Sequence, residues 1–172
     1  MKRFLPALAI ITLCLSGRLS AEELDIKGGF DASRANGIPV GWVVSNRYFD
    51  KDGSVSVNNI PDTQKKSVQI ISKTEAVHFY TIKMWPGTTG DKCSIKAMVK
   101  GSGQGSLSLY LYPDGIVMNK GFQATQEWTE CLAELTIPER KEPVDGLRVV
   151  LVVSPGASIE FSDVTAEIVK NQ

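Results

Sequence analysis

The chain has 172 residues, with 19 basic and 19 acidic side chains and therefore no formal net charge. Runs of Lys and Arg are no longer than two residues, as at Lys65-Lys66, so the sequence lacks the basic stripe expected of a nucleic-acid-binding protein. After the first 21 residues, no apolar stretch is long enough to cross a membrane as a helix.

Residues 1–21 have the pattern of a signal peptide for export. Lys2 and Arg3 precede an apolar run over residues 4–15, and Leu19-Ser20-Ala21 supplies a small residue at a cleavage point. The apolar run is too short to remain in a bilayer as a stable helix. We therefore expect an exported protein, periplasmic or extracellular, that is cleaved near Ala21.

The remaining residues, 22–172, have the usual size of one domain with a single core. They carry 16 basic and 19 acidic side chains, which gives a net charge of −3. Short alternating runs of apolar and polar residues are separated by turn residues, without a sustained apolar period of 3.6 residues. This pattern predicts an all-β sandwich or barrel with minimal helix. The runs lie near residues 55–57, 68–72, 78–84, 93–99, 106–112, 128–137, 147–153 and 159–168.

Residues 84–112 contain the clearest alternation. Four apolar residues from Cys93 to Val99 share one face of a first run, and Leu107, Leu109 and Leu111 share one face of a second. The segment between the runs, residues 100–105, reads Lys-Gly-Ser-Gly-Gln-Gly. Such a glycine-rich segment predicts a turn that joins two antiparallel strands in a hairpin.

The opposite face of the second run carries hydroxyls and aromatic rings. Because successive side chains of a strand point to opposite sides of the sheet, Ser106, Ser108, Tyr110 and Tyr112 share this face. Sugar C–H faces pack on aromatic rings, and sugar hydroxyls need partners that both donate and accept hydrogen bonds. Ser108, Tyr110 and Tyr112 are therefore candidate ligand contacts, and packing beneath another loop is the alternative.

Two more aromatic side chains are candidate ligand contacts. Trp85 stands directly before the turn Pro86-Gly87, at the expected rim of a sheet. Tyr48 belongs to a cluster of aromatic and polar residues, 46–49, on a predicted loop. A core position is the alternative for Trp85.

Removing the signal peptide leaves two cysteines, Cys93 and Cys131. An even number of cysteines in an exported chain favours a disulfide. Both lie in alternating runs at positions that face inward, so we expect them to meet. A metal site is the alternative, but two thiols and one remote histidine do not fill a tetrahedral zinc shell.

The last strand contains an irregularity. Ile159 and Phe161 have one parity, whereas Val164, Ala166 and Ile168 have the other. One extra residue near Ser162-Asp163, a β-bulge, would bring both sets to the same face. Bulges re-aim side chains, and here the re-aimed side chain would be that of Asp163.

Several short motifs resemble the carbohydrate-binding modules of families 4 and 9. The opening Gly28-Gly29-Phe30-Asp31 is followed by Gly-Ile-Pro-Val-Gly-Trp at residues 37–42, as in the G-x-P-x-G-W landmark of those families. Further likenesses are the Pro-Gly of residues 86–87, the strand start at Trp128 and the segment 159–164. The resemblance implies a galactose-binding-like jelly roll, in which two antiparallel sheets form a sandwich and a concave face holds sugars.

The resemblance also implies a structural calcium ion, with Asp31 and Asp163 as ligands. Calcium takes six to eight oxygen ligands, which carboxylates, backbone carbonyls and water supply. This chain departs from the family pattern at Lys27, which replaces an Asn, and at Ser162, which replaces an Asp. The alternative is that the two aspartates bind only turn amides.

No catalytic signature is present in the sequence. It lacks a G-x-S-x-G elbow, an H-E-x-x-H helix and a phosphate-binding loop, and it has a single histidine. We therefore expect no enzyme activity but non-catalytic binding of a polysaccharide or other glycan, by the protein alone or beside a separate glycoside hydrolase. The alternative is a structural or adhesive β-sandwich that binds protein partners in the envelope or extracellular space.

Overall fold

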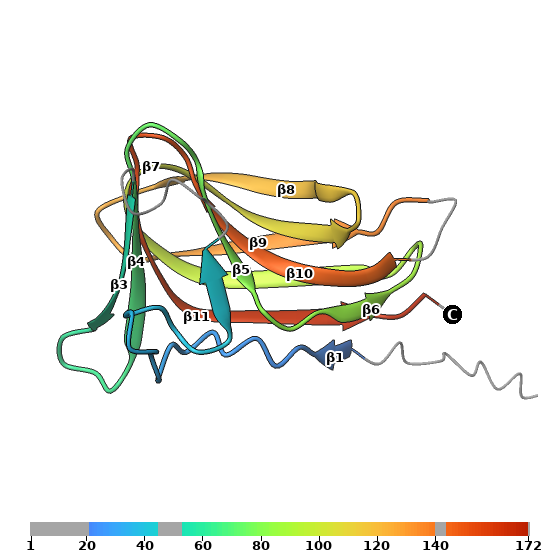
Figure 1. Ribbon diagram of the computed structural model, residues 1–172, viewed down its shortest axis with the longest axis horizontal. Coiled ribbons are helices and arrows are strands. Elements are labelled where there is room, and N and C mark those ends of the chain that lie inside the picture. Colours follow the sequence, from blue (N-terminus) through green and yellow to red (C-terminus); the bar gives the residue numbers. More distant parts are fainter. Residues whose placement is uncertain (1–20, 45–52, 140–143, 172) are drawn as a thin grey trace, which may run out of the picture.

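The computed structural model describes residues 21–44, 53–139 and 144–171. All regular elements in these ranges are β-strands, and every pairing between them is antiparallel (Figure 1). None of the described segments forms a helix of the length and apolarity needed to cross a membrane. The strands are β1 Ala21–Glu23, β2 Trp42–Val44, β3 Gly53–Asn59, β4 Lys66–Ser72, β5 Val77–Thr81, β6 Trp85–Gly87, β7 Lys92–Tyr112, β8 Gly115–Ala124, β9 Thr129–Thr136, β10 Val144–Val153 and β11 Ser158–Val169.

The strands form two sheets that share β7. In the first, the β11 sheet, the order is β9, β7, β11, β4, β3, and β1 also pairs with β11. In the second, the β10 sheet, the order is β8, β7, β10, β5, β2, and β6 also pairs with β10. Residues 92–102 of β7 belong to the β11 sheet and residues 103–112 to the β10 sheet. The predicted sandwich of two antiparallel sheets is confirmed.

The hairpin predicted around residues 100–105 is wrong, because β7 is one continuous strand that bends there from one sheet into the other. Gly101, Gly103 and Gly105 lie on the inner side of the bend, where other backbone and side chains approach closely. A Cβ atom at Gly103 would stand 2.5 Å from the Cβ of Ala157, and one at Gly105 would stand 2.8 Å from the ring of Phe122. The glycines therefore allow close packing at a corner and do not reverse the chain.

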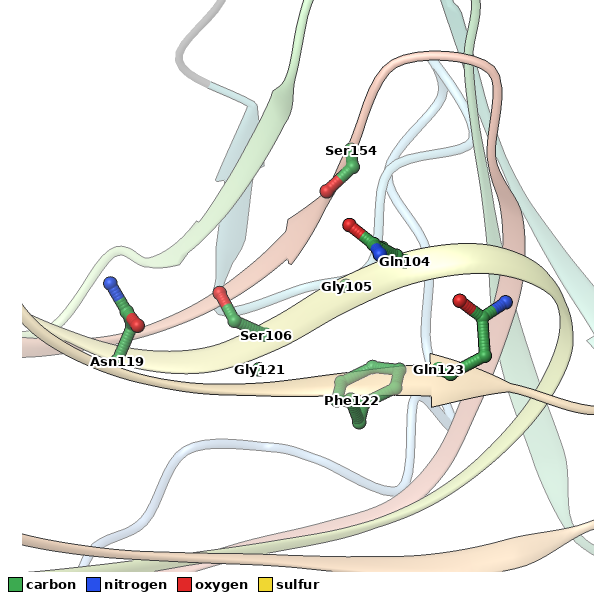
Figure 2. Close-up of a pocket in the computed structure, with 8 residues that line it drawn as sticks. All are labelled: Gln104, Gly105, Ser106, Asn119, Gly121, Phe122, Gln123 and Ser154. Atoms are coloured by element: carbon green, nitrogen blue, oxygen red, sulfur yellow. The ribbon is translucent and has the colours of Figure 1, made fainter.

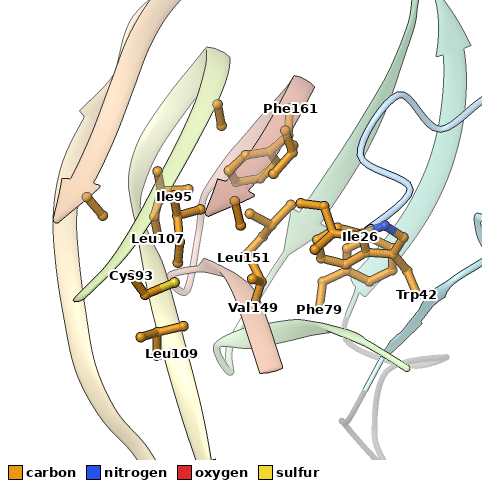
Figure 3. Packing of buried hydrophobic residues seen from close by; sticks show 14 of the residues in the cluster. Ile26, Trp42, Phe79, Cys93, Ile95, Leu107, Leu109, Val149, Leu151 and Phe161 are labelled. Carbon is orange, nitrogen blue, oxygen red and sulfur yellow. The ribbon is translucent and has the colours of Figure 1, made fainter. Parts of the chain in front are cut away.

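The inner face of β7 is apolar on both sides of the bend. Cys93, Ile95, Ala97 and Val99 are at most 1% exposed in the β11 sheet, and Leu107, Leu109 and Leu111 are fully buried in the β10 sheet. Figure 3 shows several of these side chains packed between the sheets with Phe161, and with Trp42 and Phe79 farther along the core. Each large side chain buried in this way contributes about 1.5–3 kcal/mol to the free energy of unfolding, relative to an exposed side chain. The predicted leucine row is confirmed.

The structure contradicts the predicted disulfide, because Cys93 and Cys131 are both free thiols. Cys93 pairs with Leu135 across to β9, whereas Cys131 pairs with Ala97, four residues farther along β7. Four residues span about 13 Å along a strand, which is well beyond the Cα separation of about 7 Å that a disulfide permits. Burial raises the pKa of the Cys93 thiol to about 12, and burial also raises that of Cys131 against the influence of Lys120.

The predicted bulge in the last strand is confirmed. The pairing of β11 with β7 shifts register between Ser162 and Thr165. Asp163 lies inside this interval with a left-handed φ of 49°, and the amide of Val164 donates a hydrogen bond to the carbonyl of Gly28 at 3.2 Å. The bulge therefore joins β11 to the loop that follows β1.

Candidate ligand-binding face

The outer face of the β10 sheet carries mainly polar and aromatic side chains, and we call it the polar face. Its members follow from strand register, because residues opposite each other in an antiparallel pair share a face. They contain no Asp or Glu among the described residues. They are Val43 from β2, His78 and Tyr80 from β5, Gln104, Ser106, Ser108, Tyr110 and Tyr112 from β7, Asn119, Gly121 and Gln123 from β8, and Gly146, Arg148, Val150 and Val152 from β10.

Three rings on this face contact one another edge to face. The centroids of Tyr80 and Tyr110 lie 5.6 Å apart with an interplanar angle of 82°. The ring of His78 lies 6.1 Å from that of Tyr80, and its Nδ1 is 3.3 Å from the Tyr80 hydroxyl. Burial lowers the pKa of His78, so the imidazole is neutral near pH 7. His78 and Tyr80 are not recognisable as candidates from the sequence, since their alternation fits a core strand equally well.

One end of the polar face holds a pocket that we call the amide pocket. Its volume is about 520 Å³, and Gln104, Ser106, Asn119, Gln123 and Ser154 contribute its polar side chains. Figure 2 shows the side chains of Gln104, Ser106 and Asn119 on the same side of β7 and β8, with Ser154 approaching from the end of β10. Amide and hydroxyl groups both donate and accept hydrogen bonds, as sugar hydroxyls require.

The other end of the polar face holds a second pocket, which we call the tyrosine pocket. Its volume is about 380 Å³. The structure thus brings the predicted Tyr110 and Tyr112 together with Arg148, which sequence reasoning missed. The pocket is lined by Val43, Val44, Tyr80, Met84, Tyr110, Tyr112 and Arg148.

The middle of the polar face is closed, so the two pockets are separate. Ser108 and Val150, which lie opposite each other in the register, have no exposed surface. The hydroxyl of Ser108 lies 2.9 Å from that of Ser106. Ser108 is therefore on the predicted face but too buried to contact a ligand, and it positions Ser106 instead.

Trp85 does not have the exposed rim position that the sequence suggested. It is 6% exposed, pairs with Leu147 of β10 and belongs to the core cluster. The Lys83 ammonium lies 5.4 Å from its ring centroid. Trp85 therefore offers no free ring face to a ligand. Tyr48, the remaining aromatic candidate, lies outside the described residues.

The surroundings of Asp31 and Asp163 do not fit a calcium site. The Lys65 ammonium lies 2.8 Å from the Asp163 carboxylate, and the Lys66 ammonium donates a hydrogen bond to the Asp31 carbonyl at 2.9 Å. No group of three or more His, Cys, Asp or Glu side chains in the described ranges is arranged to hold a metal ion. Two positive charges thus stand among the oxygens that calcium would need. The calcium ion implied by the sequence motifs is thus an untested prediction that these residues do not favour.

The sequence has no match among models of known protein families, and no curated protein matches it. Solved structures do match. A cyclase from Fischerella sp. TAU superposes with a TM-score of 0.65 at 10% identity, over 89% of this chain and 100% of that chain. The CBM22-1 xylan-binding domain of Paenibacillus barcinonensis Xyn10C gives 0.57 at 16% identity, over 90% and 96% of the two chains.

A CBM4 carbohydrate-binding module gives a TM-score of 0.56 at 16% identity, over 83% of this chain and 97% of that chain. At these identities the likeness concerns the fold. The chain has the β-sandwich jelly roll of carbohydrate-binding modules, as the sequence motifs predicted.

Proposed function

We propose that this protein binds a poly- or oligosaccharide on the polar face of the β10 sheet, as an exported, non-catalytic module formed by residues 22–172. The observation that carries the proposal is the presence of two separate pockets on one face of the sheet, one lined mainly by amide and hydroxyl side chains and the other by tyrosines, apolar side chains and Arg148. The carbohydrate-binding modules that share the fold support it.

The two pockets offer the two kinds of contact that sugars use. In the amide pocket, Gln104 and Asn119 are exposed and supply amide groups to sugar hydroxyls. In the tyrosine pocket, the exposed ring of Tyr112 is available to a sugar C–H face. An extended oligosaccharide that occupies both pockets would pass over the closed middle row at Ser108.

The face favours binding over hydrolysis. A glycosidase needs two carboxylates on either side of the scissile bond, and the described residues of the polar face include none. One of the proteins with a similar fold is described as a cyclase, so the fold by itself does not distinguish binding from catalysis. We propose that any hydrolysis of the bound glycan is the work of a separate glycoside hydrolase.

A glycan array followed by titration calorimetry tests the proposal. We expect binding to at least one glycan class, and Tyr112→Ala should weaken it at least about tenfold, which corresponds to about 1.4 kcal/mol. Leu132→Ala is the matched control, because Leu132 is 47% exposed, close to the 49% of Tyr112, and lies in the other sheet.

Two outcomes would overturn the proposal. An array without any bound glycan removes carbohydrate binding and favours a β-sandwich that binds protein partners. Equal weakening by Tyr112→Ala and Leu132→Ala, with unchanged melting temperatures, shows that the polar face is not the binding face.

A further inference from the structure

The tyrosine pocket contains a half-buried arginine, Arg148, whose Nε atom is buried. Arg148 projects from β10 onto the polar face, where its register neighbour on β7 is Tyr110. The Nε atom of its guanidinium has no hydrogen-bond partner among the described residues. A buried donor that loses water without gaining an acceptor destabilises the folded state, so native proteins keep few of them.

The described lining of the tyrosine pocket supplies no acceptor of opposite charge to Arg148. The described residues that line the pocket are aliphatic, aromatic or Met84, and none of them is a carboxylate. The hydroxyl of Tyr80 lies against Nδ1 of His78, and burial lowers the pKa of that histidine, so its ring adds no charge near pH 7. Lys83 lies over the ring of Trp85. Arg148 is therefore the cation that the described lining presents to the pocket.

We propose that the tyrosine pocket binds the carboxylate of an acidic sugar, a uronate residue within the glycan, and that Arg148 is the residue that recognises it. This inference rests on the proposed carbohydrate binding. A guanidinium matches a carboxylate with two parallel hydrogen bonds, and the bond from Nε is one of the pair. The rings of Tyr110 and Tyr112 are placed to contact the sugar ring. The volume of about 380 Å³ lies near the lower end of the range for small-molecule sites, as one sugar residue requires.

The test compares an acidic glycan with its uncharged methyl ester. Titration calorimetry of the purified protein with an oligogalacturonate and with its methyl ester keeps the sugar and removes the negative charge. We expect the acid to bind at least about tenfold more tightly than the ester at low salt. This preference should fall as salt is added, because screening weakens the ion pair.

Variants assign the preference to one residue. Arg148→Gln should bind the acid and the ester equally, whereas Lys96→Gln, which removes the same charge from the outer face of the β11 sheet, should keep the full preference. Arg148→Lys keeps the charge but lacks Nε, and an intermediate preference is expected. Arg148→Met should melt at the same or a higher temperature than the wild type, since it removes an unpaired buried donor.

Each remaining outcome overturns a stated part of the proposal. If the acid and the ester bind equally to the wild type, or if Arg148→Gln keeps the preference, acid recognition fails while carbohydrate binding stands. Tighter binding of a sulfated oligosaccharide, lost in Arg148→Gln, replaces the carboxylate by a sulfate ester. If no neutral or acidic glycan binds at all, carbohydrate binding itself fails.

Discussion

The two halves of β7 have similar apolar side chains on the inner face but differ in the side chains of the outer face. On the inner side, apolar residues alternate without a break in parity from Cys93 to Leu111. On the outer side, residues 92–100 present lysines beside glutamates of β9 and β11, and the Lys96 ammonium lies 2.6 Å from the Glu130 carboxylate. Residues 104–112 present amide, hydroxyl and phenol groups. One strand thus borders solvent in one sheet and the candidate site in the other.

The difference shows which residues the fold constrains. Packing of the core determines the inner face of both halves, because every side chain there lies between the sheets. The outer faces do not belong to the core cluster. Their side-chain composition therefore reflects whether the face contacts solvent or a ligand. Exposed ion pairs such as Lys96 with Glu130 contribute about 0–1 kcal/mol and keep a surface soluble. The charge-poor outer face of residues 104–112 has no such role and fits a ligand instead.

Thiol labelling tests the shared inner face, and it should give the largest effect. Alkylation of Cys93 in the native protein should be at least about a thousandfold slower than in the unfolded protein, because access requires global unfolding. Cys131, which is half-buried on β9, should react faster than Cys93. Time-resolved mass spectrometry without reductant measures both rates. Cysteines that resist alkylation after unfolding would indicate a disulfide, and rapid labelling of native Cys93 would place it outside the core.

Substitution at the bend tests the connection between the two halves. Gly103→Ala should lower the free energy of unfolding by about 2–4 kcal/mol, because its φ of 91° is unfavourable for alanine and its Cβ would overlap Ala157. Gly115→Ala has a similar φ of 99° with no atom within 4 Å of the added Cβ, so it should cost only about 1–2 kcal/mol. Urea unfolding measures both. Equal losses would show that close packing at the bend contributes nothing.

The pH dependence of stability tests the polar face beside residues 104–112. Burial holds the pKa of His78 in the folded protein below 6.5, the ordinary value that applies in the unfolded chain. Between the folded and the unfolded pKa, the unfolded chain therefore binds more protons than the folded one. Stability should therefore decline as the pH falls through about 6.5. His78→Asn should remove this part of the decline, and the chain has no other histidine to obscure it. Urea unfolding between pH 5 and 8 measures this decline, and an unchanged profile in the variant would contradict a half-buried, neutral imidazole.

The smallest effect is expected at the bulge of β11, beside the charged half of β7. Because ammonium groups of Lys65 and Lys66 stand among the oxygens near Asp163 and Asp31, melting curves with calcium and with a chelator should superimpose. A ligand that binds only the folded state would raise its stability. A higher melting temperature in calcium would therefore restore the calcium site implied by the sequence motifs.

Features that depend only on residues close together in the sequence could be predicted from the sequence. Alternation alone indicated the buried leucine row and the bulge near Asp163, because parity along a strand is a local property. The glycines of residues 101–105 were misinterpreted since a tight turn and a packed corner both require a small residue, and only the approach of Ala157 distinguishes them. Arg148 was missed because its place beside Tyr110 depends on pairing between distant strands.

The predicted disulfide and the predicted exposure of Trp85 were wrong for the same reason. Parity correctly placed Cys93 and Cys131 on inner faces, but the register of β9 on β7 decides whether two inner residues stand at the same level. The sequence near Trp85 likewise indicated a turn but not that β6 would pair with β10 and cover the indole. Long-range register therefore separates what the sequence predicted from what required the structure.

The shared strand has a consequence for the order in which the molecule is made. The sheet partners of β7 are β8, β9, β10 and β11, and all of them follow it in the chain. β11 also joins β4 and β1 to the rest, so β4 and β1 lack this neighbour until the final strand has been synthesised. Folding should therefore be delayed until nearly the whole chain has left the ribosome, and such a delay would suit the export that we propose.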